Sequence, residues 1–401
     1  MKFSPRSGML PMRQSPQPNR PAALILLLLL ALSTISVDPL QAQVPLKVGA
    51  FIPFSGRWGE SGREFAKGLL DSGKWINQKG GLFGRRLEIL VVEDTGRTAE
   101  TLAAYRKLNE ADQVPLLYIY STETVLSLSP HLHYHRIPTL ASALPSEFAN
   151  PSKYPYLFTA APTFLDLAKI GIYYVSEKSG VKIRRPKMMF VGTSAAMDQH
   201  FLGEARTYAR EVGVDVGPDI QIEQPFQPSA LSVLVSQNPD FAYLSLSARE
   251  SVAVLEEGMK RGLKTKWIGN RRAFDETLSS FEGLLGVQPV APYGEGVPGM
   301  ASVMEAHQRW HPYDFHNLPY VEGWATAQVL AEVLGRSLPE QRLSRERVKS
   351  SFEGLKDFVL GGLLPPITIT PADHRPGVES RILIAKEGKL SPLTPFLSVG
   401  R

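Results

Sequence analysis

The chain has 401 residues, of which 43% are hydrophobic, 21% charged and 9% aromatic. This composition is typical of a folded globular protein and excludes collagen, coiled-coil and low-complexity chains. The formal net charge is +5, but residues 1–42 hold four basic groups and one acid, so the remainder carries only +2. We expect no nucleic acid as a partner, because its recognition requires a strongly basic surface.

The N-terminus has the pattern of a secretory signal peptide. Basic residues precede an apolar run at residues 21–32, which is too short to span a bilayer comfortably. Ala42 is a plausible cleavage-site residue, so residues 1–42 are predicted to be a signal peptide, with an uncleaved signal anchor as the alternative. The chain has no cysteine, which excludes disulfides, thiolate metal sites and a lipidated cysteine. We therefore expect an exported protein without a lipid anchor.

From Leu46 onward, short apolar runs alternate with amphipathic stretches. This alternation predicts parallel α/β sheets with right-handed crossovers. In the first part of the chain, strands are predicted at residues 46–52, 87–92, 116–119 and 139–141. Helices are predicted at about 62–77, from about 98 and from about 124. These elements predict one doubly wound lobe.

A second, independent series of elements begins after Pro162. Its strands are predicted at 187–191, 220–223, 241–246 and 266–268, and its helices at about 164–178, 197–212 and 249–262. An irregular span rich in glycine and proline, 283–299, precedes helical stretches near 300–310, 320–334 and 344–355, and a hairpin-like pair follows around 381–389.

The length of the chain also favours two lobes, since a single core stops growing at about 250–300 residues. We predict an N-terminal lobe of residues 44–160 and about 293–355, and a C-terminal lobe of residues 161–292 and about 356–401. Several crossings between the lobes would form a hinge. Ligands of doubly wound sheets bind beyond the carboxyl ends of the strands, so we expect the site in the cleft between the lobes.

The segment from Ile76 to Asp94 carries a recognisable motif. It reads Ile-Asn-Gln-Lys-Gly-Gly-Leu-Phe-Gly-Arg-Arg, followed by an apolar strand and then Asp94. It resembles the hallmark segment of the branched-chain amino-acid-binding (leucine-binding protein-like) family of periplasmic substrate-binding proteins of ABC transporters. The resemblance extends from Val44 to about Lys389. It implies an α/β type I periplasmic-binding fold, with two doubly wound parallel-sheet lobes joined by a hinge.

The resemblance also implies a function. We expect a periplasmic protein, not an enzyme, that captures a small amino-acid-like or carboxylate ligand and delivers it to the membrane permease of an ABC importer. No cofactor and no metal are expected, and the protein is expected to be a monomer. The alternative is a ligand-sensing receptor of the same fold that signals to a membrane partner.

Ligand contacts are implied first at the turn after the third strand, where the chain has Tyr120, Ser121 and Thr122. In the family, a hydroxyl at this turn helps to hold the ligand carboxylate. The chemistry agrees, because hydroxyls beside exposed N–H groups at a helix N-terminus form an anion site. A simple helix cap by Ser121 or Thr122 is the alternative, and the two roles are compatible.

Other implied contacts depart from the family pattern. Ser142 is the predicted contact after the fourth strand, although the family more often has a threonine at position 143. The family places an aromatic cover at position 61, where this chain has Ser61; Trp58 is the candidate to replace it, with plain packing as the alternative. The remaining predicted contacts are Ala141, Ala143, Ala196, Met197 and Ser247.

The most informative departure is Arg271, in the segment Asn-Arg-Arg after Gly269. Amino-acid binders place a carboxylate there, which pairs with the ligand ammonium. A guanidinium would repel an ammonium but bind a carboxylate by a charge-assisted bond worth roughly 1.5–3 kcal/mol. We therefore predict that Arg271 binds an acidic or amino-free ligand. The alternative is that Arg271 and Arg272 are solvated and that Asp275 or Glu276 supplies the carboxylate.

Two other patterns carry less weight. His131, His133 and His135 alternate, but only two of them share a helical face and no acid or cysteine is near, so we interpret them as surface residues. The segment 192–196 superficially resembles the nucleophile elbow of an α/β-hydrolase, yet its final glycine is missing.

Overall fold

The computed structural model describes residues 1, 3, 4, 8, 44–142, 145–178, 180, 184–193, 196–315, 317–338 and 343–400, without the side chains of 178 and 196–200. Residues 1–43 and 44–401 are separate compact units, and only the second is discussed further. The predicted signal peptide therefore lies almost wholly outside the described residues. None of the described helices has the length and apolar character needed to cross a membrane.

The first sheet has five parallel strands in the order β2-β1-β3-β4-β5. They are β1 (Leu46–Ile52), β2 (Leu87–Glu93), β3 (Leu117–Ile119), β4 (Thr139–Ala141) and β5 (Leu157–Thr159). All four strands predicted for this part of the chain are present, and β5 is an addition. Because the strands are parallel, the residues that follow β1, β3 and β4 meet at one edge of the sheet.

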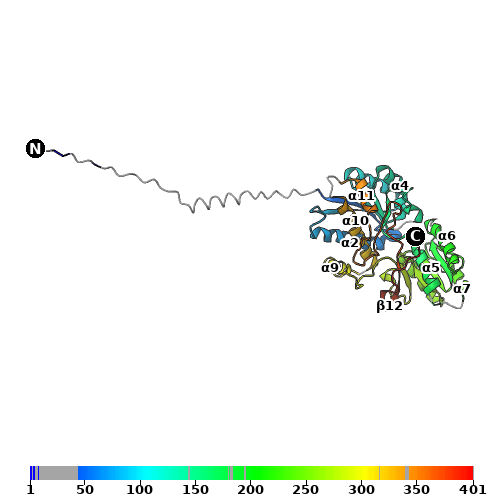
Figure 1. The fold of residues 1–401 in the computed structure, drawn as a ribbon. Helices are drawn as coiled ribbons and strands as arrows, with labels where there is room; N and C mark the ends of the chain where they lie inside the picture. The colour runs from blue at the N-terminus through cyan, green and yellow to red at the C-terminus, as the bar shows by residue number, and fades with distance from the viewer. Residues whose placement is uncertain are drawn as a thin grey trace. The chain divides into compact units, whose positions relative to one another are not determined.

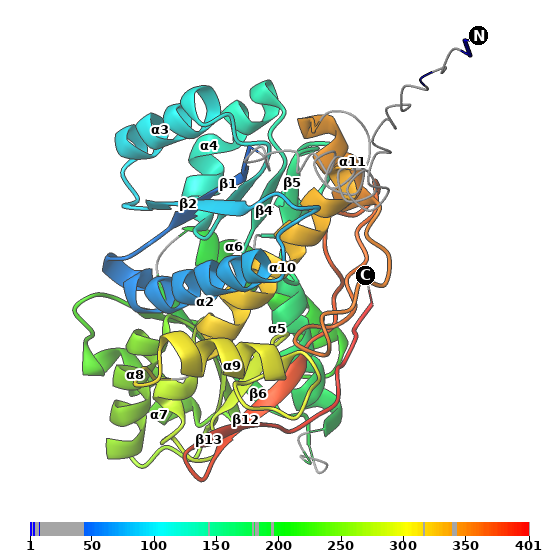
Figure 2. The ribbon, with the colours of Figure 1, turned by 90° about the vertical axis from the view of Figure 1, so that its left-hand side faces the viewer.

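Helices cover both faces of this sheet, and together they form what we call the N-terminal lobe (Figures 1 and 2). The helices between β1 and β5 are η1 (Gly56–Trp58), α2 (Gly59–Gln78), α3 (Thr98–Arg106), η2 (Lys107–Ala111), α4 (Thr122–His135) and η3 (Ser146–Ala149). The chain later returns to this lobe with α9 (Met300–Trp310), α10 (Leu318–Ser337) and α11 (Arg345–Glu353).

The close approach of α2 and α10 explains this return. A Cβ atom on Gly68 would lie 1.9 Å from the carbonyl oxygen of Tyr320, and one on Gly323 would lie 2.0 Å from that of Phe65. Only glycine fits at either position, so the two backbones touch with no side chain between them. Figure 2 shows α2 and α10 lying side by side. Helix α10 is therefore anchored to the N-terminal lobe.

The second sheet has the order β13-β12-β11-β10-β9-β6-β7, and β8 also pairs with β6. Its parallel strands are β6 (Lys187–Thr193), β7 (Asp215–Val216), β8 (Ile220–Ile222), β9 (Phe241–Ser245), β10 (Lys266–Gly269) and β11 (Leu285–Gln288). The antiparallel pair β12 (Arg381–Lys386) and β13 (Lys389–Pro392) extends the sheet. The span 283–299 was expected to be irregular, and β11 shows that this expectation was wrong for its first part.

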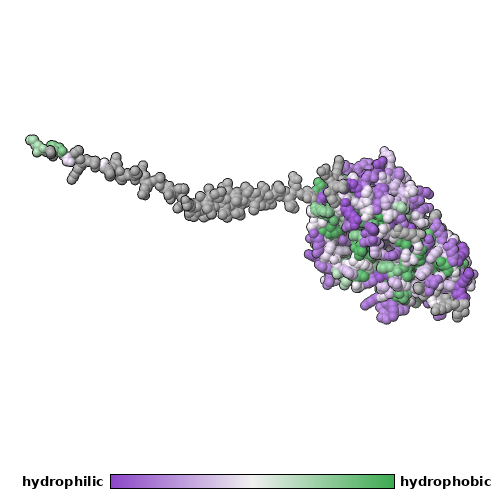
Figure 3. All heavy atoms as spheres, in the orientation of Figure 1, coloured by the Kyte–Doolittle hydropathy of each residue, from purple (hydrophilic) through white to green (hydrophobic). Residues whose placement is uncertain are grey.

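This sheet and its helices form what we call the C-terminal lobe. The helices are α5 (Phe164–Tyr173), η4 (Tyr174–Lys178), α6 (Ala196–Glu211), η5 (Pro228–Leu231), α7 (Ser232–Gln237), α8 (Ala248–Lys260) and η6 (Glu276–Leu278). Helix α7 was not predicted from the sequence. In Figure 1, α5, α6 and α7 gather at the end of residues 44–401 away from α4 and α11. Figure 3 shows a mainly hydrophilic surface with scattered hydrophobic residues on the face in view.

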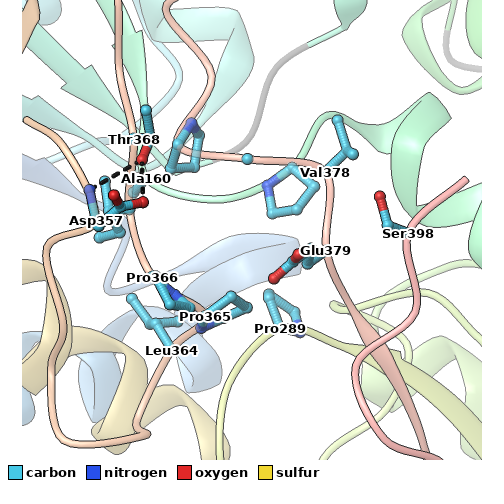
Figure 4. A pocket seen from close by; sticks show the side chains of 14 residues that line it. Ala160, Pro289, Asp357, Leu364, Pro365, Pro366, Thr368, Val378, Glu379 and Ser398 are labelled. Atoms are coloured by element: carbon cyan, nitrogen blue, oxygen red, sulfur yellow. Dashed lines mark hydrogen bonds between the residues drawn. The ribbon is translucent and has the colours of Figure 1, made fainter. Parts of the chain in front are cut away.

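The chain crosses between the sheets after β5, after β11 and between α11 and β12. A cavity of about 350 Å³ lies among these crossings, and residues from all three line it (Figure 4). Its walls include five prolines: Pro162, Pro289, Pro365, Pro366 and Pro376. Because proline fixes φ, these walls are locally stiff. The lobe boundaries proposed at 160/161, about 292/293 and about 355/356 remain a prediction.

The α2–α10 contact leads to a stability prediction. Gly323→Ala should lower the free energy of unfolding by about 1–3 kcal/mol, the usual cost of overpacking, because the new methyl group would meet the backbone of Phe65. Gly203→Ala in α6 is the matched control: nothing lies within 4 Å of its Cβ position, so it should gain about 0.5–1 kcal/mol. Urea denaturation measures the free energy of unfolding of both variants. The same change in Gly323→Ala as in Gly203→Ala would contradict the close contact of α2 and α10.

Candidate functional site

Hydrogen bonds within the C-terminal lobe fix the loop after β10, and the side chains of Arg271 and Arg272 extend from this loop to the N-terminal lobe. The side-chain oxygen of Asn270 accepts the backbone N–H groups of Arg272 and Ala273, each at 2.9 Å. Gln288 of β11 donates from Nε2 to the carbonyl of Arg271, at 2.9 Å. These bonds tie the loop to its own lobe, so the directions of the two guanidinium groups are set by the C-terminal lobe.

Arg271 reaches across to the N-terminal lobe. Its side chain is 3% exposed, and its Nη1 donates to Oε1 of Glu322 on α10 at 2.6 Å. Nη2 donates to the hydroxyl of Ser142, which follows β4 and itself donates to Glu322 at 3.3 Å. Nε of Arg271 is buried and has no partner among the described residues. The alternative of a solvated Arg271 is therefore wrong.

Arg272 crosses to a second group of N-terminal-lobe residues. Nη2 donates to the carbonyl oxygen of Tyr120 at 2.8 Å. The guanidinium carbon lies 4.7 Å from the ring centroid of Trp58 and 4.5 Å from that of Tyr120. Arginine on an aromatic face is attracted by the ring quadrupole. Tyr120 donates to Ser61 at 3.0 Å, and Ser61 donates to the carbonyl of Trp58 at 3.1 Å. The structure thus joins Trp58, Ser61 and Tyr120 in one cluster around Arg272.

A third arginine, Arg57, extends from the N-terminal lobe to the C-terminal lobe. Nε of Arg57 in η1 lies 3.0 Å from Oε2 of Glu250 in α8. Glu250 also forms a capping box with Ser247, since the hydroxyl of Ser247 accepts the N–H of Glu250 and the carboxylate of Glu250 accepts the backbone N–H of Ser247. The structure therefore places the predicted contact Ser247 at the N-terminus of α8, as a helix cap beside an ion pair between the lobes.

Ser121 faces a buried carboxylate of its own lobe. Its hydroxyl donates to Oδ2 of Asp94, and Thr124 donates to Oδ1 at 2.7 Å. Ser121 is the N-cap residue of α4 but makes no side-chain cap bond, so the alternative of a simple Ser121 cap is wrong. Thr122, the first residue of α4, is buried. The hydroxyl of Ser121 is thus engaged by Asp94.

Three predicted contacts have no described side-chain environment. Ala143 lies outside the described residues, and the side chains of Ala196 and Met197 at the start of α6 do as well. The hydrolase-like segment is also incomplete, because residues 194 and 195 are outside the described part. Ala141 is the last residue of β4 and is buried, one residue before Ser142.

Asp275 and Glu276, the alternative source of a carboxylate, have local roles. Asp275 accepts the N–H of Thr277 at 2.9 Å at the start of η6. Oε2 of Glu276 accepts the N–H of Leu318, the first residue of α10, at 2.6 Å. Burial raises the pKa of both carboxyl groups, and that of Glu276 to about 8. The carboxylate that faces Arg271 is instead Glu322.

Glu322 is the residue that the sequence analysis missed. The signal was an acid flanked by apolar residues of α10, where Val321, Gly323 and Trp324 are all buried; Glu332 is the other acid of this helix in such a setting. An acid surrounded by buried residues needs a partner, and this is a reason to look for one. Its partners Arg271 and Ser142 lie 51 and 180 positions away in the sequence.

Two buried tyrosines complete the polar environment. Burial raises the pKa of the Tyr118 and Tyr120 phenols, and the negative charge of Glu322 raises both further. The arginines act in the opposite sense: Arg271 lowers both pKa values, and Arg272 lowers that of Tyr120. Neutral phenols can donate hydrogen bonds. The groups around Glu322 therefore include guanidinium, hydroxyl and phenol donors.

The histidines of α4 surround an aromatic side chain. Tyr105 donates to the carbonyl of His131 at 3.2 Å and lies 2.9 Å from Nδ1 of His135. The ring of His133 lies against Tyr156 instead. Within the described residues, no group of three potential metal ligands occurs.

Comparison with known sequences decides the family. The sequence profile of a family described as periplasmic binding proteins matches residues 45–389. The chain belongs to this family. Its members bind substrates and are not enzymes, so the expected family and the non-enzymatic class are confirmed. No curated protein sequence matches this family member.

Solved structures confirm the fold. A branched-chain amino-acid ABC transporter protein from Thermus thermophilus with bound valine has a TM-score of 0.82 and 20% identity, over 89% of this chain and 97% of that one. A fatty acid ABC transporter substrate-binding protein from Thermomonospora curvata has a TM-score of 0.77 and 18% identity, over 88% of this chain and 92% of that one. An R. palustris solute-binding protein in complex with benzoate has a TM-score of 0.73 and 18% identity, over 89% of this chain and 98% of that one. The type I periplasmic-binding fold is thus confirmed.

The burial of Glu276 predicts a pH effect on this substrate-binding protein. Its pKa of about 8 in the folded state exceeds the ordinary value of about 4.3, so the folded protein holds a proton that the unfolded chain releases. This contribution to stability is present below about pH 4 and is lost as pH rises to about 8.

Glu276→Gln should therefore weaken the fall in unfolding free energy between about pH 5 and pH 8. Urea denaturation across this range measures the slope. Glu305→Gln is the control, because Glu305 is an exposed residue of α9, and it should keep the wild-type slope. The same slope in Glu276→Gln as in the wild type would show that Glu276 titrates normally.

Proposed function

We propose that this protein captures a small carboxylate in the cleft between its lobes and delivers it to the permease of an ABC importer. The observation that carries the proposal is Arg271. Its buried guanidinium spans from one lobe to the other and retains an Nε–H without a partner among the described residues. Arg272 retains a buried Nε–H of the same kind. Buried donors without partners are costly, and an anionic ligand would satisfy them.

The location supports binding coupled to closure. Ser142 follows β4 and Tyr120 follows β3, whereas Arg271 follows β10, so the donors come from the carboxyl ends of strands in both sheets. A ligand held by groups of both lobes binds the closed form better than the open form. It therefore shifts the population toward closure, and a permease that recognises the closed form can read this shift.

The ligands of similar structures share one chemical group. Valine and benzoate, which are bound in two of them, both carry a carboxylate, and so does a fatty acid. Benzoate and fatty acids have no amino group. By its resemblance to the amino-acid binders, this chain has Arg271 where they place a carboxylate for the ligand ammonium. This supports an organic carboxylate without an amino group as the ligand.

The proposal extends to the setting of the protein. The predicted signal peptide at residues 1–42 and the family both support a periplasmic location. We propose a monomer that is released without a lipid anchor, because the chain has no cysteine to carry one. The partners are then the small carboxylate and the membrane permease.

A thermal-shift screen tests the ligand class. Protein is expressed from the full-length chain and stripped of bound ligand. Its melting temperature is then measured with each of four compounds separately: valine, leucine, isovalerate and benzoate. A true ligand at about 100 times its Kd should add roughly 2.7 kcal/mol of stability. We expect the amino-free acids to raise the melting temperature and the amino acids to raise it less.

Arg271→Ala should abolish the shift caused by the amino-free acids. Arg97→Ala is the matched control, because Arg97 is an exposed arginine paired with Glu100 on the N-terminal lobe, and it should keep the full shift. Stabilisation by valine or leucine alone, unchanged in Arg271→Ala, would show that the protein binds amino acids without Arg271.

A further inference from the structure

Arg271 and Arg272 carry more charge than the single carboxylate that they contact. They extend from the C-terminal lobe, and Glu322 is the carboxylate that meets them from the N-terminal lobe. Arg57 and Glu250 lie at the same interface but pair with each other at 3.0 Å, so together they add no net charge. Among the described contacts, Arg271 and Arg272 meet one carboxylate, which leaves a formal charge of +1 at these two side chains. The buried carboxylate of Asp94 is hydrogen-bonded to Ser121 and Thr124 instead.

We propose that Glu322 determines ligand specificity by limiting the charge that the site accepts to a single carboxylate. This inference rests on the function proposed above and names its substrate class, the monocarboxylates. One carboxylate neutralises the remaining positive charge, whereas a dicarboxylate would bring its second negative charge close to Glu322. Unpaired like charges in a buried site are strongly unfavourable.

The free donors agree with this charge balance. Glu322 occupies Nη1 of Arg271, Ser142 occupies Nη2, and the carbonyl of Tyr120 occupies Nη2 of Arg272. The buried Nε–H groups of the two arginines have no partner among the described residues, and neither has the buried phenol of Tyr118. One carboxylate can accept from such groups while its charge is neutralised.

Glu322 also holds the site in position, and this separates its role from that of a surface charge. It accepts from Arg271 at 2.6 Å and from Ser142 at 3.3 Å, so it links the loop after β10 to the strand end of β4. Its side chain is 15% exposed. The close contact of α2 and α10 at Gly323, the next residue, fixes its backbone. The negative charge therefore has a defined place.

The test compares acids that differ by one carboxylate. Dissociation constants are measured by calorimetry for benzoate against phthalate and for isovalerate against methylsuccinate. We expect the wild type to bind each monocarboxylate at least about tenfold more tightly than its dicarboxylate, a difference of about 1.4 kcal/mol. Equal affinities in the wild type would overturn the inference, whatever the variants do.

Glu322→Gln should reduce this preference about tenfold or reverse it, because the amide keeps the size and removes the charge. Glu322→Asp keeps the charge and should retain the preference. Glu332→Gln is the control on the same helix: Glu332 pairs with Arg336 on the exposed side of α10, and its loss should change nothing. A preference that persists unchanged in folded Glu322→Gln would show that Glu322 does not set it.

The outcomes also separate this inference from the proposed function. If no carboxylate of either kind binds, the proposed function itself fails. If monocarboxylates bind and Arg271→Ala abolishes their binding, but the preference over dicarboxylates is absent, the proposed function holds and only the role of Glu322 falls.

Discussion

A buried guanidinium must have its charge compensated, and for Arg271 the compensation comes from the other lobe. Glu322 and Ser142 both belong to the N-terminal lobe, while the loop that carries Arg271 is tied to β11. An isolated buried charge is far more costly than a paired one. The contact between the lobes is therefore linked to the charge around Arg271, and any group that changes this charge also changes the energy of the contact.

The placement of Glu322 follows from a backbone contact rather than from the site itself. Gly68 and Gly323 allow α2 and α10 to touch, and this contact holds α10 on the N-terminal lobe. Glu276 then accepts the first N–H of the same helix from the opposite lobe, at 2.6 Å. Helix α10 thus packs against one lobe and is capped by the other. It is the element through which the cleft and the fold are connected.

The fold could be predicted from local patterns, but the site only in part. Strands such as β1 and β2 are long apolar runs with clear ends, whereas β5 has three residues and β11 lies in a stretch rich in glycine, where no periodicity can develop. Arg271 was singled out as a candidate because its charge departs from the family pattern, and its role in binding stays a prediction. Glu322 was not singled out, because α10 is buried over most of its surface, and its sequence does not reveal which side faces the other lobe.

The cavity among the three crossings has a further physical consequence. Its volume of about 350 Å³ is lined by residues of all three crossings, five of them prolines. Each proline fixes its own φ angle. Any movement of one sheet against the other would need backbone rotation in the crossings, and the prolines confine this rotation to the residues between them. The number of backbone angles available to such a movement is therefore set by the sequence of the crossings and not by the ligand.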